Sequence, residues 1–331
     1  MKNKLNGSIL VVALISMALI GGVFAVHGQE LFKDQYNIRV VVHGGIADPF
    51  WKVVEKGVKD AAANHDDLKV TYSGPSSYDF TEFMSTLESA IAANPDALVV
   101  TLTQPPAMDD VLRPAIKNGL PVVGINAPDL RPRDERLPVL TYVGMDSHFI
   151  GVKAARESME RIDDLDRGLY VNHHPGARNI EARGNGWVET LKANDIAAGT
   201  LNIGVDPAKG AELVVNYLTR HPDTDVIFSG NTQRTEAIIK RLEDEGYDVG
   251  NEIKICQMDI SPTVLDYIKK GKIMFTLDQQ QYMQGYLGVE LAYLNAKYGL
   301  APPPAPVSTG PSVITKEDVP RLEKLAGKDY R

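Results

Sequence analysis

Residues 38–72 read IRVVVHGGIADPFWKVVEKGVKDAAANHDDLKVTY, and the alternation inside this stretch predicts the fold. Residues 38–42 are rich in the β-branched residues Ile and Val and predict a first strand. Residues 50–64 carry apolar side chains at helical spacing, and residues 69–72 predict a second short strand. A strand, a helix and a strand in this order predict two parallel strands with the helix packed on one face of the sheet.

The same alternation continues along the chain and restarts near residue 168. The predicted later strands are 97–101, 121–125, 140–143, 168–172, 200–203, 226–229, 253–257 and 273–277, and the predicted later helices are 80–93, 108–118, 181–194, 208–219, 235–245, 262–269 and 284–298. Residues 301–306 are rich in proline and extended, and they lead into a last expected strand at 307–309. The sequence therefore predicts an α/β protein with two doubly wound parallel-sheet lobes.

The N-terminus has the order of a secretory signal peptide. Lys2 and Lys4 precede an apolar run at residues 9–20, and Val23-Phe24-Ala25 offers short side chains at the expected cleavage site. Cleavage after Ala25 would leave about 300 residues, enough for two domains of about 150 residues each. A membrane anchor is the alternative, but the apolar run is short for a span of about 20 residues. We expect export to the periplasm.

Composition narrows the function further. Cys256 is the only cysteine, which excludes an internal disulfide and a zinc site built from cysteines. Export without disulfides suits a bacterial periplasmic protein with a large core. The net charge of −8 argues against a nucleic-acid partner. The three-glycine fingerprint of dinucleotide sites is absent, so we expect no cofactor.

Ligands of open parallel sheets bind beyond the carboxyl ends of the strands. The segments that follow the predicted strands are rich in Asp, Asn, Gln, Arg and aromatic residues. They are 44–51, 101–106, 126–129, 172–183, 230–234, 259–262 and 278–281. Planar polar side chains can hydrogen-bond hydroxyls in two directions, and aromatic faces can cover the C–H face of a sugar ring. The pattern predicts a site for a small polar solute.

Short motifs in this chain resemble those of the type I periplasmic binding proteins of the ribose, galactose and inositol kind. They follow the family's order and spacing from about residue 38 to residue 309. The motifs are Asp48-Pro49-Phe50-Trp51, Asn94-Pro95-Asp96-Ala97, Leu120-Pro121-Val122-Val123, Tyr142-Val143-Gly144-Met145-Asp146 and Glu181-Ala182-Arg183-Gly184-Asn185-Gly186-Trp187, with Asn231, Asp259 and Gln279 after later strands.

The resemblance implies three crossing strands that act as hinges near Met145, Gln280 and Ser308. It also implies that a sugar or sugar-like solute closes the lobes, and that the closed form, as a monomer, docks on the membrane permease of an ABC importer. The implied boundaries are 1–25 for the signal peptide, 37–145 plus 280–308 for the N-terminal lobe, and 146–279 plus 309–331 for the C-terminal lobe.

The resemblance assigns roles to individual residues as well. Phe50 and Trp51 should sandwich the solute, while Asn231, Asp259 and Gln279 should hydrogen-bond its hydroxyls. The whole set of candidate ligand-binding residues is Asp48, Phe50, Trp51, Gln104, Asn126, Asn179, Glu181, Arg183, Asn231, Asp259 and Gln279.

Three positions depart from the family pattern. Glu181 stands where relatives have an arginine, Asn126-Ala127 where they have an Asp-Arg pair, and Val205 where they have an aromatic residue. Glu181 together with Asp259 would make the pocket acidic. We therefore expect a polyol or an amino-bearing solute, whose cation could pair with a carboxylate.

Several candidates also have structural interpretations. Phe50 and Trp51 could be core residues at the start of an amphipathic helix, which Asp48 before a proline would begin. Asn231 is a possible cap, Asp259 a possible loop acid, and Arg183 a possible helix-start residue. Residues 279–281 are all glutamine, so the contact assigned to Gln279 could belong to its neighbour in the run.

The histidines offer a metal site as an alternative, which we do not favour. His173 and His174 are adjacent at a strand end, where successive side chains point in opposite directions and rarely hold one ion. His43 is expected to be buried beside the first strand.

Two other functions stay open: a sensor subunit that presents its ligand to a chemoreceptor or signalling kinase, and a periplasmic α/β enzyme. The enzyme lacks support, because the sequence has no G-x-S-x-G elbow, phosphate loop or metal-ligand spacing.

Overall fold

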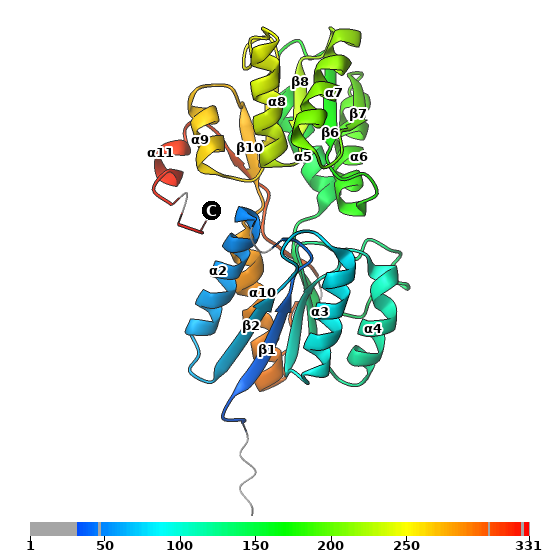
Figure 1. The fold of residues 1–331 in the computed structure, drawn as a ribbon, viewed down its shortest axis with the longest axis vertical. Coiled ribbons are helices and arrows are strands. Elements are labelled where there is room, and N and C mark those ends of the chain that lie inside the picture. The colour runs from blue at the N-terminus through cyan, green and yellow to red at the C-terminus, as the bar shows by residue number, and fades with distance from the viewer. Residues whose placement is uncertain (1–31, 46–47, 304, 326–327, 331) are drawn as a thin grey trace, which may run out of the picture. The chain divides into compact units, whose positions relative to one another are not determined.

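The computed structural model describes residues 32–45, 48–303, 305–325 and 328–330. The predicted signal peptide at 1–25 lies outside the described residues. Residues from Gln35 onward form one compact unit that contains two six-stranded sheets (Figure 1). Each sheet and the helices packed on it form one lobe, which confirms the predicted α/β class with two lobes.

The first lobe contains the sheet β11-β5-β4-β3-β1-β2, in which all strand pairs are parallel. Its strands are β1 (Tyr36–Val41), β2 (Leu68–Ser73), β3 (Ala97–Thr101), β4 (Val122–Ile125), β5 (Thr141–Gly144) and β11 (Val307–Ser308). Its helices are α2 (Pro49–Ala63), α3 (Phe80–Ala92), α4 (Pro105–Lys117) and α10 (Gln281–Tyr298).

The second lobe contains the sheet β12-β10-β9-β8-β6-β7, parallel except for the pair β10–β12. Its strands are β6 (Arg167–Asn172), β7 (Ala197–Asn202), β8 (Val226–Ser229), β9 (Lys254–Met258), β10 (Phe275–Asp278) and β12 (Ser312–Ile314). Its helices are α5 (Ser147–Met159), α6 (Arg178–Lys192), α7 (Pro207–Arg220), α8 (Thr232–Asp244), α9 (Pro262–Lys269) and α11 (Val319–Leu322).

The central strand β3 of the first sheet is buried along its whole length, because both faces of the sheet are covered there. Val99 in β3 packs into the core under α2 and α10, whereas its neighbours Leu98 and Val100 pack into the core under α3 and α4. Side chains on a strand alternate between the two faces. A strand buried on both faces therefore needs an unbroken hydrophobic run.

The chain passes between the sheets three times: after β5, after β10 and after β11. These passages coincide with the positions near Met145, Gln280 and Ser308 where crossings were expected. They begin at the carboxyl ends of β5, β10 and β11, so they run beside the ends of the strands where a ligand site is expected.

Helix α5 and strand β12 were missed by the sequence analysis, and several helices begin earlier than predicted. Helix α5 was missed because its buried face consists largely of small residues, such as Gly151, Ala154 and Ala155, which give a weak hydrophobic pattern. Strand β12 is short. Helices α4, α6, α8 and α10 each begin three residues before the predicted start. Their first turns carry polar residues or proline, so hydrophobic spacing does not reveal them.

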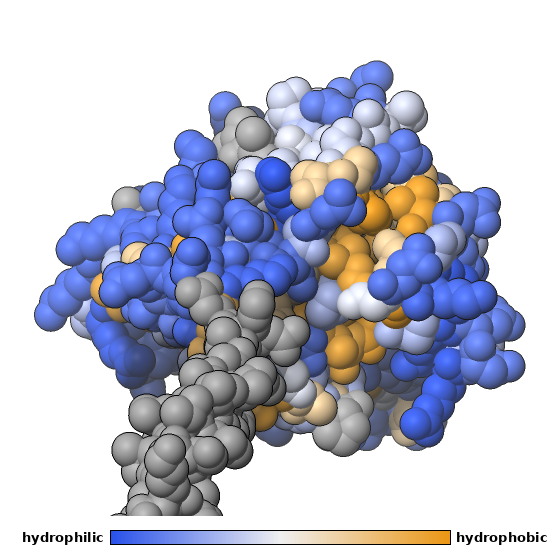
Figure 2. Space-filling view, turned by 90° about the horizontal axis from the view of Figure 1, so that it is seen from below, coloured by the Kyte–Doolittle hydropathy of each residue, from blue (hydrophilic) through white to orange (hydrophobic). Residues whose placement is uncertain are grey.

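Hydrophilic side chains cover most of the face seen from below, with one region of hydrophobic residues (Figure 2). None of the helices in the described part of the chain is both long enough and apolar enough to span a bilayer.

Helices α5 and α6 pack closely because glycines face the backbone of the partner helix. A Cβ at Gly186 would lie 2.1 Å from the His148 carbonyl oxygen, and a Cβ at Gly151 would lie 1.9 Å from the Arg183 carbonyl oxygen. Side-chain atoms do not approach backbone oxygens this closely, so any larger residue would push the two helices apart.

We predict that Gly186→Ala lowers the free energy of unfolding by about 1–3 kcal/mol because of this overlap. Helix propensity alone would favour alanine by about 0.5–1 kcal/mol, so the sign of the change is diagnostic. Urea denaturation measures it, with Asn185→Ala on the exposed face of the same helix as the control. A stabilised Gly186→Ala variant would contradict the close packing.

Candidate ligand-binding site

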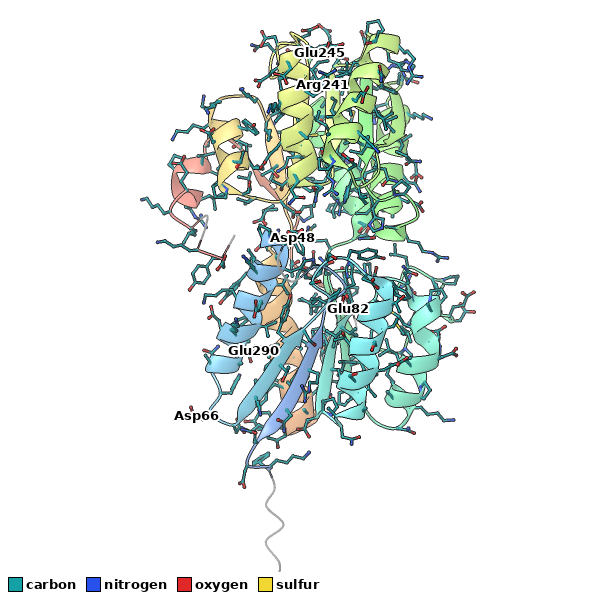
Figure 3. All side chains as sticks on the ribbon, viewed as in Figure 1. Asp48, Asp66, Glu82, Arg241, Glu245 and Glu290 are labelled. Atoms are coloured by element: carbon teal, nitrogen blue, oxygen red, sulfur yellow. The ribbon has the colours of Figure 1, made fainter. Side chains whose placement is uncertain are left out.

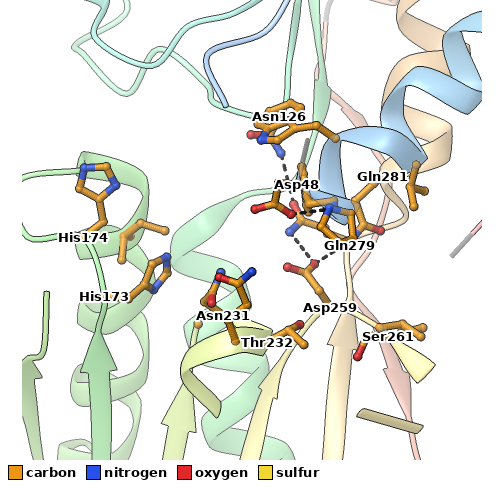
Figure 4. Close-up of a pocket in the computed structure, with 18 of the residues that line it drawn as sticks. Asp48, Asn126, His173, His174, Asn231, Thr232, Asp259, Ser261, Gln279 and Gln281 are labelled. Atoms are coloured by element: carbon orange, nitrogen blue, oxygen red, sulfur yellow. Dashed lines mark hydrogen bonds between the residues drawn. The ribbon is translucent and has the colours of Figure 1, made fainter. Parts of the chain in front are cut away.

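A cavity of about 500 Å³ lies between the two sheets and is lined by residues of both lobes. Most of the predicted binding residues line it: Asp48, Phe50, Trp51, Asn126, Asn179, Arg183, Asn231, Asp259 and Gln279. They come from segments next to the carboxyl ends of strands and from the first turns of helices (Figure 4). A cavity of this size can enclose a small solute.

Two predicted residues lie outside the cavity lining. The Gln104 side chain donates a hydrogen bond to the hydroxyl oxygen of Tyr78, 3.2 Å away, and it is Tyr78 that lines the cavity. Glu181 is exposed, and its carboxylate accepts a hydrogen bond from the Gly176 backbone N–H at 2.9 Å. Glu181 therefore orders the loop before α6, and the expected acidic pair of Glu181 with Asp259 is wrong.

Other carboxylates line the cavity instead. They belong to Asp48, Glu236, Asp259 and Asp329. Asp48 is the N-cap of α2, and its Oδ1 accepts a hydrogen bond from the Phe50 backbone N–H at 2.9 Å, as the Asp-Pro start signal predicted. Figure 3 shows Asp48 at the end of α2 that faces the second lobe. Burial raises the pKa of Glu236.

Phe50 and Trp51 form a corner of the cavity wall. Their ring centroids are 4.9 Å apart and their planes meet at 73°, so in this arrangement they cannot cover two opposite faces of one solute ring. Trp51 is only 6% exposed and packs into the core of the first lobe. It also fits closely over Gly44, where a Cβ would lie 1.6 Å from the indole Nε1. The two rings are therefore not arranged as the predicted sandwich, and Phe50 is the more exposed of the two residues.

The second lobe contributes a wall of polar side chains fixed by backbone contacts. Arg183 is 5% exposed, and its Nη1 donates to the Gly230 carbonyl oxygen at 3.3 Å. Asn231 is the N-cap of α8, and its Oδ1 accepts from the Arg234 backbone N–H at 3.3 Å. Asn231 thus has the cap role considered from sequence, whereas Arg183 lies inside α6 and not at its start, and both residues line the cavity.

Three histidines line the cavity, a feature that sequence analysis did not assign to the site. Burial, and secondarily the nearby His174, lowers the pKa of His43 to about 4. Burial, and secondarily Arg183, lowers the pKa of His173 to about 3. At neutral pH these rings are uncharged. The signal that could have revealed them is their position directly after β1 and β6, at the carboxyl ends of strands.

Asp259 follows β9 and holds an unusual backbone conformation, with φ at 75°. Its Oδ1 accepts hydrogen bonds from Gln279 Nε2 at 2.7 Å and Gln281 Nε2 at 3.0 Å (Figure 4). Burial raises the pKa of Asp259 to about 7, while the Gln279 hydrogen bond and Arg183 oppose the rise. Asp259 can therefore accept or donate a proton in a hydrogen bond near neutral pH.

Amide side chains connect Asp259 to the crossings between the lobes. Asn126 Nδ2 donates to Gln284 Oε1 at 3.1 Å and lies 3.5 Å from Gln279 Oε1. Gln284 Nε2 donates to the Gln279 carbonyl oxygen at 3.1 Å and lies 3.4 Å from Thr309 Oγ1. Asn126, Gln284, Gln279 and Asp259 therefore belong to one hydrogen-bonded network that reaches from the first lobe to the second.

Comparison with known proteins places this chain in a family. The sequence family described as periplasmic binding protein domain matches residues 38–300, and the chain belongs to it. This confirms the family resemblance inferred from the motifs.

Individual relatives and a solved structure agree with this family assignment. The chain is 24% identical over 303 residues to the xylose/arabinose-binding protein of Sulfolobus acidocaldarius, covering 88% of this chain and 74% of that protein. It is 25% identical over 260 residues to the ribose import binding protein of Bacillus subtilis, covering 78% and 81%. A carbohydrate transporter structure from Acidothermus cellulolyticus, in complex with myo-inositol, matches with a TM-score of 0.78 and 27% identity, covering 90% of this chain and 100% of that chain.

We predict that Asp259→Asn stabilises the protein at pH 8. The folded-state pKa of about 7 lies above the ordinary value of 3.8, so the folded protein holds this proton more tightly than the unfolded chain does. The contribution of this group to the free energy of unfolding is fully present below about pH 4 and is lost as the pH rises through 7. Asparagine keeps an acceptor oxygen and has no proton to lose.

The expected gain is about 1–3 kcal/mol at pH 8 and shrinks towards pH 4.5, as measured by urea denaturation across that range. Asp244→Asn makes the same charge change at an exposed site of α8 and serves as the control. A difference between Asp259→Asn and wild type that does not change with pH would contradict the raised pKa.

Proposed function

We propose that this protein is the periplasmic solute-binding component of an ABC importer and that it binds a sugar or polyol in the cavity between its lobes. The observation that carries the proposal is a cavity lined by polar side chains from both lobes, in a member of the periplasmic binding protein family. A solute that contacts both lobes stabilises the closed arrangement by its differential affinity. The lobes, 37–145 plus 280–308 and 146–279 plus 309–331, would move about the three crossings.

The unmet hydrogen-bonding capacity of the cavity favours a neutral, hydroxyl-rich solute. Nδ1 of His43 and Nδ1 of His173 are buried and have no hydrogen-bond partner among the described residues. Both rings are uncharged at neutral pH, and a neutral imidazole offers one donor and one acceptor. A hydroxyl is both donor and acceptor, so it suits an uncharged imidazole in the cavity wall whichever tautomer is present.

An amino-bearing solute is the weaker alternative. It was expected on the basis of Glu181 together with Asp259, and Glu181 lies outside the cavity. Asp48 and Glu236 still offer carboxylates to a cation, but Arg183 adds a buried positive charge to the same wall. We therefore favour a monosaccharide or polyol, in line with the solutes named for the relatives.

The proposed activity is binding without a chemical reaction. Ser261, which lines the cavity, is the N-cap of α9, and its Oγ accepts a hydrogen bond from the Val264 backbone N–H at 3.1 Å. This cap role accounts for the serine without a nucleophilic function. We further propose that residues 1–25 direct export to the periplasm and that the closed protein, as a monomer, docks on the permease.

We predict that D-xylose, D-ribose or myo-inositol stabilises the protein in a thermal-shift screen that also includes D-glucosamine. A ligand at 100 times its Kd adds about 2.7 kcal/mol of stability. The tightest compound is then measured by calorimetric titration. Tighter binding of D-glucosamine than of every neutral sugar and polyol would favour the amino-bearing class, and no response to any compound would contradict solute binding of this kind.

We predict that Phe50→Leu weakens binding of the tightest neutral compound about tenfold, because leucine keeps apolar bulk but lacks the flat ring face that covers C–H groups. Glu181→Gln should leave the affinity within about twofold, because this side chain contacts the Gly176 backbone and not the cavity. Calorimetric titration measures both variants. A large loss in Glu181→Gln would place that residue at the site after all.

A further inference from the structure

The three consecutive glutamines at 279–281 have distinct roles in the structure. Gln279 Nε2 and Gln281 Nε2 both donate to Oδ1 of Asp259, at 2.7 Å and 3.0 Å (Figure 4). Gln280 Nε2 instead donates to Ser312 Oγ at 3.1 Å, and Gln280 does not line the cavity. Gln281 was not among the residues predicted from sequence.

Gln281 reaches Asp259 from the other lobe. It is the first residue of α10, a helix that packs with α2 into the core of the first lobe. Asp259 follows β9, a central strand of the second sheet. The Gln281 side chain is 3% exposed, so this hydrogen bond is largely shielded from water. It joins the two lobes at the carboxylate that faces the cavity.

The orientation of the second donor, Gln279, is set by its own partners. Its Oε1 lies 3.5 Å from Asn126 Nδ2 and 3.4 Å from Gln284 Nε2, both of which are donors. With the oxygen facing these donors, the amide nitrogen of Gln279 faces Asp259. Gln284 is fully buried and is held in turn by the Gln279 carbonyl oxygen. The Gln281 amide and the Gln279 amide are thus held by different contacts. A substitution of Gln281 should therefore remove its hydrogen bond to Asp259 and leave the bond from Gln279 in place.

We propose that Gln281 is a positioning residue for solute binding: with Gln279 it occupies Oδ1 of Asp259 across the lobe boundary, so that Oδ2 is presented to the solute. This proposal rests on the proposed function. Two donors on one oxygen restrict rotation of the carboxyl group more than a single donor does. Because Gln281 belongs to the first lobe, the carboxylate is held in this orientation only while the lobes are in the arrangement seen here.

The pKa of Asp259 reports on the hydrogen bond from Gln281, because the charges and contacts around the carboxyl group set that pKa. Arg183 favours the ionised carboxylate, while Asp48 and Asp278 disfavour it, and burial disfavours it most. Hydrogen bonds donated to a carboxylate stabilise its ionised form. Loss of the Gln281 amide should therefore raise the pKa of Asp259 further and leave more of this group protonated at pH 7.

The first test follows the Asp259 carboxyl carbon by NMR titration in the ligand-free full chain, with Asp259→Asn used for assignment. We expect Gln281→Met, which keeps an unbranched side chain of similar length without the donor, to raise the pKa of Asp259 by roughly half a unit or more. The matched control Gln280→Met removes a neighbouring amide that does not contact Asp259 and should cause no comparable shift. An unchanged pKa in Gln281→Met would overturn the proposal. If that variant does not fold, Gln281→Ala is titrated in its place.

The second test measures affinity for whichever of myo-inositol, D-xylose and D-ribose binds the wild type most tightly. We expect Gln281→Met to weaken binding about tenfold at pH 7, the loss expected for one buried hydrogen bond. The pH dependence of its affinity should shift upward by the same amount as the pKa of Asp259, while Gln280→Met keeps the wild-type profile. A wild-type profile in Gln281→Met would overturn the positioning role. If none of the three compounds binds the wild type, the proposed function fails, and the NMR titration still decides whether Gln281 holds Asp259.

Discussion

The hydrogen bonds that pair the strands in parallel place the carboxyl ends of neighbouring strands on one edge of each sheet. In both lobes that edge borders the cavity, so residues far apart in sequence meet there: Asn126 after β4, His173 after β6 and Asp259 after β9. The crossings after β5 and β11 leave the first sheet at this edge, and the crossing after β10 leaves the second sheet at its corresponding edge. The cavity, the crossings and the amide network between them all follow from the direction of the strands.

Much of the fold could be predicted from the sequence because the strands of a sheet covered on both faces are continuous apolar runs, as in Val99 and its neighbours. Helix α5 escaped because its buried face is built from small residues such as Ala154, which pack well without a strong hydrophobic pattern. Polar first turns also escaped, and those are the turns that place Asn179, Asn231 and Gln281 at the cavity or beside it.

The site was only partly predictable, since position after a strand does not determine where a side chain points. Glu181 falls in a matching motif, yet its carboxylate turns back to the Gly176 backbone. Phe50 and Trp51 are adjacent on a helix, where successive side chains diverge by about 100°, so two parallel faces were not available to them. The run of three glutamines could not be assigned from spacing, because the contacts that distinguish them come from Ser312 and Asp259, far away in sequence.

Three non-glycine residues next to the cavity have positive φ angles: Asn126 at 59°, Asp259 at 75° and Gln280 at 55°. This backbone region is open to asparagine and aspartate at modest energetic cost and is severely restricted for β-branched side chains. Asn126 and Asp259 are also the polar groups that face the cavity. Changes in solute preference at these two positions are therefore confined to a small set of short polar residues and glycine, and the freedom to alter specificity lies in helix first turns, such as those that carry Phe50 and Asn179.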